Sequence, residues 1–442
     1  MEKSILIKTE LPGPRARKLL DDNKRYRYPR GPFTFDFVAE RAEGAFIEDV
    51  DGNRFLDFMG GIAVLSTGSC HPRVVEAIEE QLKKFLHVGP TFFFDTEIRL
   101  AEKISGLAPG ETPKRVFLGN SGTESIEAAI KAARHKTRRP GIISFIGSFH
   151  GRTLGAMSIS ASKVTHRKFM GPLLPEVHFV HYPYCYRCPF HLEYGQCGID
   201  CLTYIREVLF QKIIAPEDVA AIVVEPIQGE GGYIVPPPEF LPALRDLTRE
   251  FEIVLVADEI QTGSGRTGKF FAVEHWGVEP DIISLAKGIA SGFPIGVMVA
   301  ADDVLTWEPG AHGTTFGGNP LSCVAALETI DLLQNGLVDN AAQVGSWILD
   351  QLKELKSRFE VIGDVRGKGL MIGLEIVKDK KTKTVDPDLR NELIKKAYQK
   401  GLLLLDCGTS SIRICPPLVL TREEAAIGLS ILKESIEETP VS

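Results

Sequence analysis

The 442-residue sequence predicts an α/β protein whose large domain has a mostly parallel central sheet, joined to a smaller α+β domain. Short apolar runs alternate with helical segments from His71 to about residue 319, a pattern typical of parallel strands covered on both faces. Beyond that point the alternation gives way to helical segments over 320–333 and 337–357, followed by mixed strands and helices. The expected regions are an N-terminal arm and hairpin over 1–70, a large domain over 71–325, and a C-terminal region over 326–442 that completes the small domain with the hairpin.

Composition limits the classes of function to consider. Hydrophobic residues make up 44% of the chain and charged residues 25%, which are ordinary values for a soluble globular protein. The net charge of −7 argues against nucleic acid or an anionic membrane as the main partner. The apolar runs are too short to span a membrane, and the N-terminal residues lack the apolar stretch of a secretory signal. We therefore expect a cytoplasmic protein.

The N-terminal region is expected to open with a basic, partly helical arm over 12–30. The stretch AFIEDVDGNRFLDF has apolar runs on both sides of Asp51-Gly52, which predicts a β-hairpin with its turn at that pair. Residues 72–86 then have apolar side chains at helical spacing, and 115–135 has the pattern of a strand, a tight turn and a helix.

Two buried runs in the middle of the chain each end on a charged side chain. Residues 253–257 are followed by Asp258, and residues 282–286 by Lys287. Ligands of open parallel sheets bind just beyond the carboxyl ends of the strands, so this carboxylate and this amine suggest a cofactor site. A lysine that extends past the sheet edge into water is the alternative. Partial desolvation would instead lower the pKa of Lys287 and provide the free amine that Schiff-base chemistry requires.

Residues 120–123, Asn-Ser-Gly-Thr, lie between a predicted strand and a predicted helix. Backbone N–H groups at a helix start, together with hydroxyl groups, can hold a phosphate. Ser121 and Glu124 also have the spacing of a capping box, which requires no ligand. Both interpretations remain open, and the run 312–319 has the same ambiguity.

Further aromatic and charged groups follow other strands. Phe149-His150-Gly151-Arg152 comes after the run IISFIG, and Glu225 and Glu230 come after AAIVV. An aromatic ring at a strand end can stack on a planar ligand, and an arginine can bind a carboxylate through two parallel hydrogen bonds. Arg152 could equally be a solvated or ion-paired surface residue. Carboxylates buried at strand ends are more often functional than structural.

The glycine-rich run 263–269, GSGRTGK, satisfies the GxGxxG pattern and nearly satisfies that of a P-loop. Phe270 stands where a P-loop requires Ser or Thr, and the next helical segment is too short for a dinucleotide-binding crossover. We interpret the run as a glycine-rich active-site loop. A non-catalytic nucleotide-binding protein built on this loop is a competing hypothesis, and it would have no need of Lys287.

A carboxylate, a lysine, a phosphate cup and a ring-stacking aromatic together indicate pyridoxal 5′-phosphate (PLP), although no single motif does so. Asp258 facing the pyridine nitrogen would keep that nitrogen protonated, and the ring could then accept electrons.

The motifs occur in an order that resembles the class III (ornithine/4-aminobutyrate-type) aminotransferases of PLP fold type I. The resemblance extends over nearly the whole chain, from EDVDGNRFLDF through NSGTES, FHGRT, EPIQGEGG, DEIQTGSGRTGKFFA, LAKG and TTFGGNP to VRGKGLMIGLEI and IRICPPL. It implies a large domain with a mostly parallel sheet and a small α+β domain built from both ends of the chain.

The resemblance also implies roles for individual residues. Lys287 would form the aldimine with the cofactor and then move the substrate's α-proton, and Asp258 would pair with the ring nitrogen. The remaining expected cofactor-binding residues are Ser121, Gly122 and Thr123 at the phosphate, Phe149 on the ring face, Gln261 at the ring hydroxyl, His150 and Glu225 at strand ends, and Thr315 from the neighbouring subunit. The active unit should therefore be at least a homodimer.

The resemblance further implies substrate contacts. Arg413 would bind the α-carboxylate, Glu230 would pair with Arg413 when a substrate is held by its ω-amino end, and Arg152 would take a distal carboxylate. The main hypothesis is an aminotransferase that uses ω-amino or basic amino acids and 2-oxoglutarate. An amino-acid racemase on the same scaffold is the alternative, because its cofactor residues would be identical. The preferred amino acid and the assembly beyond a dimer stay open.

Four of the eight cysteines cluster as Cys185-x2-Cys188-x8-Cys197-x3-Cys201. A zinc tetrathiolate, two disulfides and unliganded thiols are all compatible with this spacing. No metal-binding residue is assigned, and the sequence does not decide among the three.

Overall fold

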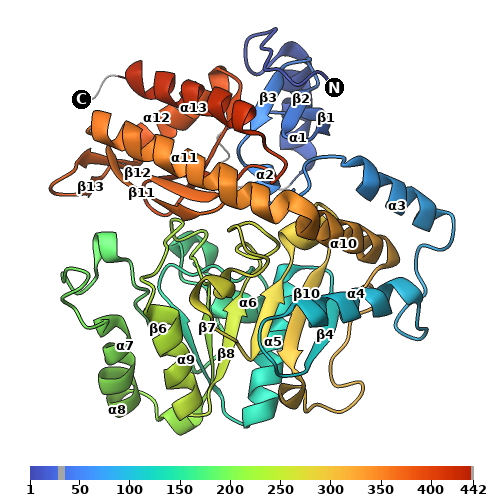
Figure 1. Cartoon of the computed structure of the whole chain (residues 1–442), viewed down its shortest axis with the longest axis vertical. Helices are drawn as coiled ribbons and strands as arrows, with labels where there is room; N and C mark the ends of the chain where they lie inside the picture. The colour runs from blue at the N-terminus through green and yellow to red at the C-terminus, as the bar shows by residue number, and fades with distance from the viewer. Residues whose placement is uncertain (28–34, 440–442) are drawn as a thin grey trace.

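The computed structural model describes residues 1–27 and 35–439, which form two packed bodies. Figure 1 shows the cyan to yellow strands of the middle of the chain in one body. The blue N-terminal strands and the orange and red C-terminal helices lie together in the other body, where both termini are found. The domain boundaries near residues 70 and 325 remain predictions.

The larger body is built on a seven-stranded sheet in the order β4-β10-β9-β8-β7-β5-β6. Its strands are β4 (Lys114–Gly119), β5 (Gly141–Phe145), β6 (Val177–Val180), β7 (Val219–Val224), β8 (Val254–Asp258), β9 (Ile282–Leu285) and β10 (Gly296–Ala301). The five strands from β9 to β6 pair in parallel, whereas β10 is antiparallel to both of its neighbours. The predicted α/β class with a mostly parallel sheet is therefore confirmed.

Both faces of this sheet are buried. Neighbouring residues of one strand contribute to two different cores: Ile222 and Leu255 pack into one cluster, while Val223 and Val256 pack into the other. This is the expected result of side chains alternating along a strand, and it explains the continuous apolar runs in the sequence. The first face is covered by α3 (Pro72–Leu82), α4 (Asp95–Leu107), α9 (Phe240–Glu250) and α10 (Pro320–Leu332), and the second by α5 (Gly122–Thr137) and α6 (Leu154–Ser158).

The smaller body combines both ends of the chain. A four-stranded sheet has the order β1-β2-β3-β14, in which β14 from near the C-terminus pairs in parallel with β3. A five-stranded sheet contains β11, β12, β16 and β15 in order, with β13 beside β12. The bounds are β1 (Ala39–Glu43), β2 (Phe46–Asp49), β3 (Arg54–Asp57), β11 (Ile362–Lys368), β12 (Met371–Asp379), β13 (Thr384–Val385), β14 (Leu402–Leu403), β15 (Leu405–Cys407) and β16 (Ser411–Ile414).

Of the remaining helices, α11 (Val338–Arg358) and α12 (Pro387–Gln399) pack on the five-stranded sheet, and α13 (Arg422–Glu437) packs on these two helices and on β14. The others are α1 (Pro14–Tyr26), α2 (Gly60–Ala63), α7 (Asp200–Tyr204) and α8 (Phe210–Lys212). The hairpin predicted around Asp51-Gly52 is the β2–β3 pair. Residues 28–30 of the predicted N-terminal arm lie outside the described residues.

The helices predicted over 320–333 and 337–357 differ from the structure at their junction. They form one 39-residue helical stretch, Pro320–Arg358, with a wider turn near Gly336, where the backbone leaves helical geometry. By length and composition this stretch could cross a membrane. Ile330, Leu333 and Ile348, however, are fully buried in the protein, so this stretch is a core helix.

Candidate active site

A cavity of about 320 Å³ lies beyond the carboxyl ends of the central strands. Its lining includes Asn120, Ser121, Gly122, Thr123, Phe149, His150, Glu225, Asp258, Ile260, Gln261 and Lys287. Nine of the expected cofactor-binding residues thus meet in one place, as strand ends of a parallel sheet are expected to do. Thr315 instead is exposed and lines a separate depression with His87 and Phe94.

Lys287 follows β9 and faces this cavity. Its φ of 44° lies in the left-handed region that residues with a Cβ atom seldom adopt, a strain that is often found at functional sites. Burial lowers the pKa of Lys287, while the negative charges of Asp258 and Glu225 oppose this effect. A lysine with a lowered pKa holds more of the neutral amine that acts as a nucleophile and as a base.

Asp258 ends β8 and is 3% exposed. One of its carboxylate oxygens lies 2.6 Å from His150 Nδ1, and the other accepts a hydrogen bond from the backbone N–H of Ile260 at 3.0 Å. Burial disfavours a charge on His150, but the contact with Asp258 outweighs burial and raises the pKa of His150. The pair therefore fixes the orientation of the Asp258 carboxylate in the cavity lining.

Glu225 also lies at a strand end, but both of its oxygens bind backbone. Oε1 accepts from the N–H of Phe149 at 2.8 Å, and Oε2 accepts from the N–H of Gly229 at 2.7 Å. Burial raises the pKa of Glu225 to about 7, an effect that His150 opposes. Although it lines the cavity, its contacts show a carboxyl group that ties the Phe149 turn to the turn after β7.

The start of α5 combines the two interpretations of residues 120–123. Ser121 Oγ accepts from the N–H of Glu124 at 3.4 Å, and the Glu124 side chain accepts from the N–H of Asn120 at 2.6 Å, so the cap is present. The first N–H groups of a helix have no partner within the helix, and Gly122 and Thr123 at the start of α5 belong to the cavity lining. A capped 16-residue helix whose N-terminus opens on the cavity is suited to an anion such as phosphate.

Phe149 and Gln261 complete the cavity wall. The ring of Phe149 lies 5.8 Å from the guanidinium carbon of Arg152, and Arg152 itself is not among the residues that line the cavity. Gln261 accepts a hydrogen bond from the Tyr233 hydroxyl at 2.8 Å through its amide oxygen, so its NH2 group remains the donor available to a ligand.

The expected substrate residues Glu230 and Arg413 form an ion pair with an Nη2–Oε2 distance of 2.5 Å. Arg413 lies on β16 of the small body, and its positive charge is close enough to help lower the pKa of Lys287. Lys163 is a partner that sequence reasoning missed, since its Nζ lies 2.7 Å from Glu230 Oε1. Burial opposes ionisation of Glu230, but Arg413 and Lys163 together hold its pKa below the ordinary value.

The cysteine cluster lies away from the cavity lining, in the segment between β6 and α8. Across residues 1–27 and 35–439, all eight cysteines are free thiols. In the same part of the chain, no group of three or more His, Cys, Asp or Glu side chains is arranged to hold a metal ion.

Comparisons with known proteins agree with this geometry. The family described as Aminotransferase class-III matches residues 28–436. An alanine/serine racemase from Pyrococcus horikoshii is 41% identical over 442 residues, covering 97% of this chain and 92% of its own. A probable 4-aminobutyrate aminotransferase from Bacillus subtilis is 42% identical over 405 residues, covering 90% and 92%. The crystal structure of a Bacillus anthracis aminotransferase, 30% identical, matches 98% of this chain and 100% of its own with a TM-score of 0.90.

Proposed function

This chain belongs to the class III aminotransferase family, and on that premise we propose that it moves an amino group from an ω-amino or basic amino acid to 2-oxoglutarate. The resemblance inferred from the motifs is thereby confirmed, and with it the cofactor, because the family uses PLP. The residues of the cavity fit that group: an amine at Lys287, a carboxylate at Asp258, and the N-terminus of α5 for a phosphate. Electron withdrawal from the substrate Cα is the chemistry that PLP supplies when bound.

Side chains of the protein would carry out the other parts of the reaction. Asp258, fixed by His150 and a backbone N–H, offers its carboxylate as the partner that a ring nitrogen requires. Lys287 Nζ, with its lowered pKa, is the base that takes the proton from the substrate Cα. Phe149 provides a flat apolar face, and the NH2 group of Gln261 provides a donor for a ring oxygen.

The observation that carries the proposal is the Glu230–Arg413 pair at 2.5 Å. While the pair is formed, Glu230 neutralises the charge of Arg413. This state suits an amino-group donor that reacts through its ω-amino group, because no α-carboxylate then has to bind Arg413. When an α-carboxylate binds Arg413, Glu230 must give up this contact. Lys163, already 2.7 Å from Glu230, provides the carboxylate with a partner in that second state. One site can therefore accept both an ω-amino donor and a 2-oxo acid.

The proposal is tested by incubating the purified protein and PLP with L-amino acids or 4-aminobutyrate, each with and without 2-oxoglutarate. We expect glutamate to form only when 2-oxoglutarate is present. We also expect Lys287→Ala to abolish both the activity and the visible absorbance band of the bound cofactor. A D-amino acid that appears without any oxo acid would overturn the aminotransferase proposal.

An amino-acid racemase is the second candidate, favoured by the 41% identity to an alanine/serine racemase. A racemase returns the proton to Cα on the opposite face, whereas an aminotransferase does not return it to Cα. Both reactions begin with the same base at Lys287, so both fit the cavity. The test above separates them by product.

We also propose a homodimer in which Thr315 of one subunit serves the cavity of the other. Support comes from the exposure of Thr315 and of its neighbour Phe316, which is 61% exposed although it is a large apolar residue. A cytoplasmic location remains the expectation from the composition.

A further inference from the structure

The segment between β6 and α7, residues 181–199, contacts both bodies; we call it the excursion. At its start, the hydroxyl of Tyr182 lies 3.0 Å from the carbonyl oxygen of Glu225 and 3.1 Å from that of Pro226. Further along, Tyr184 and Arg187 reach β12 of the small body. The excursion thus links the strand end beneath the cavity to the sheet that carries Arg413.

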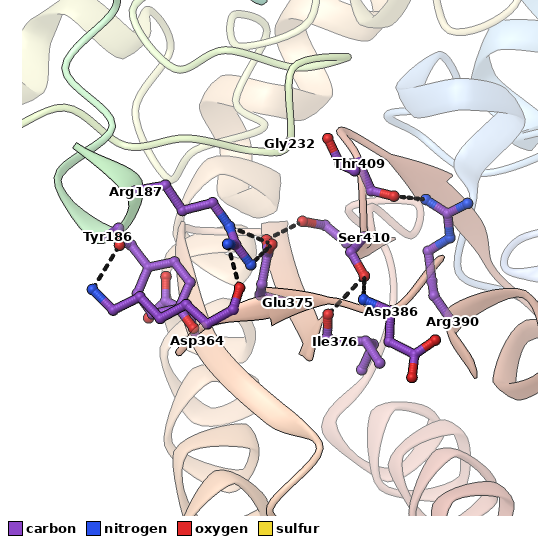
Figure 2. A network of polar contacts seen from close by, with 12 residues as sticks. Tyr186, Arg187, Gly232, Asp364, Glu375, Ile376, Asp386, Arg390, Thr409 and Ser410 are labelled. Atoms are coloured by element: carbon purple, nitrogen blue, oxygen red, sulfur yellow. Dashed lines mark hydrogen bonds and ion pairs between the residues drawn. The ribbon is translucent and has the colours of Figure 1, made fainter. Parts of the chain in front are cut away.

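Its contact point on β12 is Glu375, a carboxylate that is only 2% exposed. Figure 2 shows Arg187 pointing from the excursion to Glu375, and two of its nitrogens lie 2.9 and 3.0 Å from Oε1. Oε2 of Glu375 accepts three hydrogen bonds, from Tyr184 at 3.0 Å, Ser411 at 2.6 Å and Arg366 at 2.8 Å. Burial alone would raise the pKa of Glu375, but the two arginines and Ser411 together lower it. The carboxylate is therefore ionised and shared by two arginines.

From Glu375 the network continues to the Glu230–Arg413 pair by two routes. Arg366 donates to the carbonyl oxygen of Gly232, from Nε at 3.1 Å and from Nη2 at 2.6 Å, and Gly232 is two residues beyond Glu230. Ser411 lies two residues before Arg413 on β16, where it pairs with Glu375 across the strands. Each member of the ion pair thus lies two residues along the chain from a residue that the Glu375 network holds, Gly232 for Glu230 and Ser411 for Arg413.

We propose that the excursion is a positioning element for the Glu230–Arg413 pair and acts through Arg187 to set the affinity for the substrate's α-carboxylate. This rests on the proposed role of Arg413 as the carboxylate-binding residue. Without Arg187, Arg366 is the one arginine left to neutralise Glu375. The hydrogen bonds from Arg366 to the carbonyl oxygen of Gly232 are then expected to weaken. Losing a hydrogen-bonded partner of a buried charge is costly, so the turn that carries Glu230 becomes less fixed.

The test compares Arg187→Gln with Arg206→Gln. Arg206 forms a two-bond ion pair with Glu250 at 2.7 Å, half exposed and remote from β12, so this control removes an equal charge from the same part of the chain. Because Glu230 competes with the substrate's α-carboxylate for Arg413, a less fixed Glu230 should compete less well. We therefore expect Arg187→Gln to lower the KM for 2-oxoglutarate about tenfold and to change kcat less than about twofold. Arg187→Lys should return the KM part of the way to the wild-type value because it keeps the charge, and the control should match wild type.

Two further measurements exclude a merely structural role for Arg187. In a Glu230→Gln background, Arg187→Gln should lower the KM no further, because its effect passes through Glu230. A second tenfold fall in the KM there would overturn this route. Amide hydrogen exchange over 229–233 and 405–413 should be faster in Arg187→Gln than in the control, and equal exchange in the two variants would overturn the proposal.

The design separates this inference from the proposed function. If the wild-type protein racemises instead of transaminating, the aminotransferase proposal fails, and the same variants are compared by the KM for the L-amino acid, whose α-carboxylate also requires Arg413. Hydrogen exchange requires no activity at all. An unchanged KM for whichever carboxylate substrate the enzyme uses would overturn the positioning role.

Discussion

Replacing Glu230 with glutamine should shift the choice between the two substrate orientations. The substitution keeps the size of a side chain that is 17% exposed and removes only its charge. In the native protein Glu230 lies 2.5 Å from Arg413 and 2.7 Å from Lys163. In Glu230→Gln, Arg413 loses its neutralising carboxylate and is left for the α-carboxylate of a substrate.

The size of the effect follows from the contact that is lost. L-Glutamate must displace Glu230 from Arg413 before its α-carboxylate can bind, whereas 4-aminobutyrate leaves the pair intact. A hydrogen bond to a charged group contributes about 1.5–3 kcal/mol, and each 1.4 kcal/mol corresponds to about a factor of ten. The ratio of kcat/KM for L-glutamate over that for 4-aminobutyrate should therefore rise about 10- to 100-fold.

Single-turnover half-reactions measure this ratio directly. Each amino donor is mixed with the PLP-loaded enzyme, and the visible band of the bound cofactor is followed without any oxo acid. Glu250→Gln is the matched control, because it also removes a carboxylate held by an arginine, at 2.7 Å, far from the cavity. If both donors change by the same factor in Glu230→Gln, or if the ratio falls, the switching role of this carboxylate is wrong.

Three further experiments test the site shared between subunits, the partner of the ring nitrogen and a buried carboxyl group. Re-pairing Lys287→Ala chains with Thr315→Ala chains should restore about a quarter of wild-type activity, because half of random dimers are hybrids with one intact site; an inactive mixture would contradict the shared site. Asp258→Asn should lower kcat about 100-fold or more at saturating substrate, since the ring nitrogen loses a charged partner; an unchanged kcat would refute that role. Burial raises the pKa of Glu259 from 4.5 to about 7. Its contribution to stability is therefore complete below about pH 4.5 and is lost as the pH rises through about 7. In urea unfolding, Glu259→Gln should lose about 3 kcal/mol less than wild type over that range, and an equal loss would contradict the shift.

Much of the fold could be predicted because its signals are local. Continuous apolar runs indicate strands buried on both faces, and the split of Ile222 and Val223 between two cores is the structural counterpart of that pattern. The gathering of Asp258, Lys287 and Glu225 in one cavity follows from the same pattern, because parallel strands place their carboxyl ends on one edge.

The pairings within the site could not be predicted in this way. His150 and Asp258 are 108 residues apart, and Lys163 and Glu230 are 67 apart. Both contacts depend on the order of the strands in the sheet and on the path of the loops, which no local pattern encodes. Lys163 also lies in a loop, and its side chain is 35% exposed. In the sequence it therefore cannot be distinguished from an ordinary solvated lysine.

The distribution of the site over two bodies explains why related enzymes can share its chemistry and differ in substrate. Lys287 and Asp258 follow strands of one sheet, whose packing fixes them in relation to each other. Arg413 comes from the other body, and Glu230 lies on a turn between the two, where its carbonyl oxygen accepts a hydrogen bond from the N–H of Gly408 at 2.8 Å.

A small change in how the two bodies meet would therefore move Arg413 and Glu230 without disturbing Lys287. Under the proposed roles, proton transfer at Cα would depend on the first body alone, whereas carboxylate recognition would depend on contacts such as that between Arg187 and Glu375. Substitutions at this junction should accordingly change the KM for carboxylate substrates before they change the rate of the chemical step.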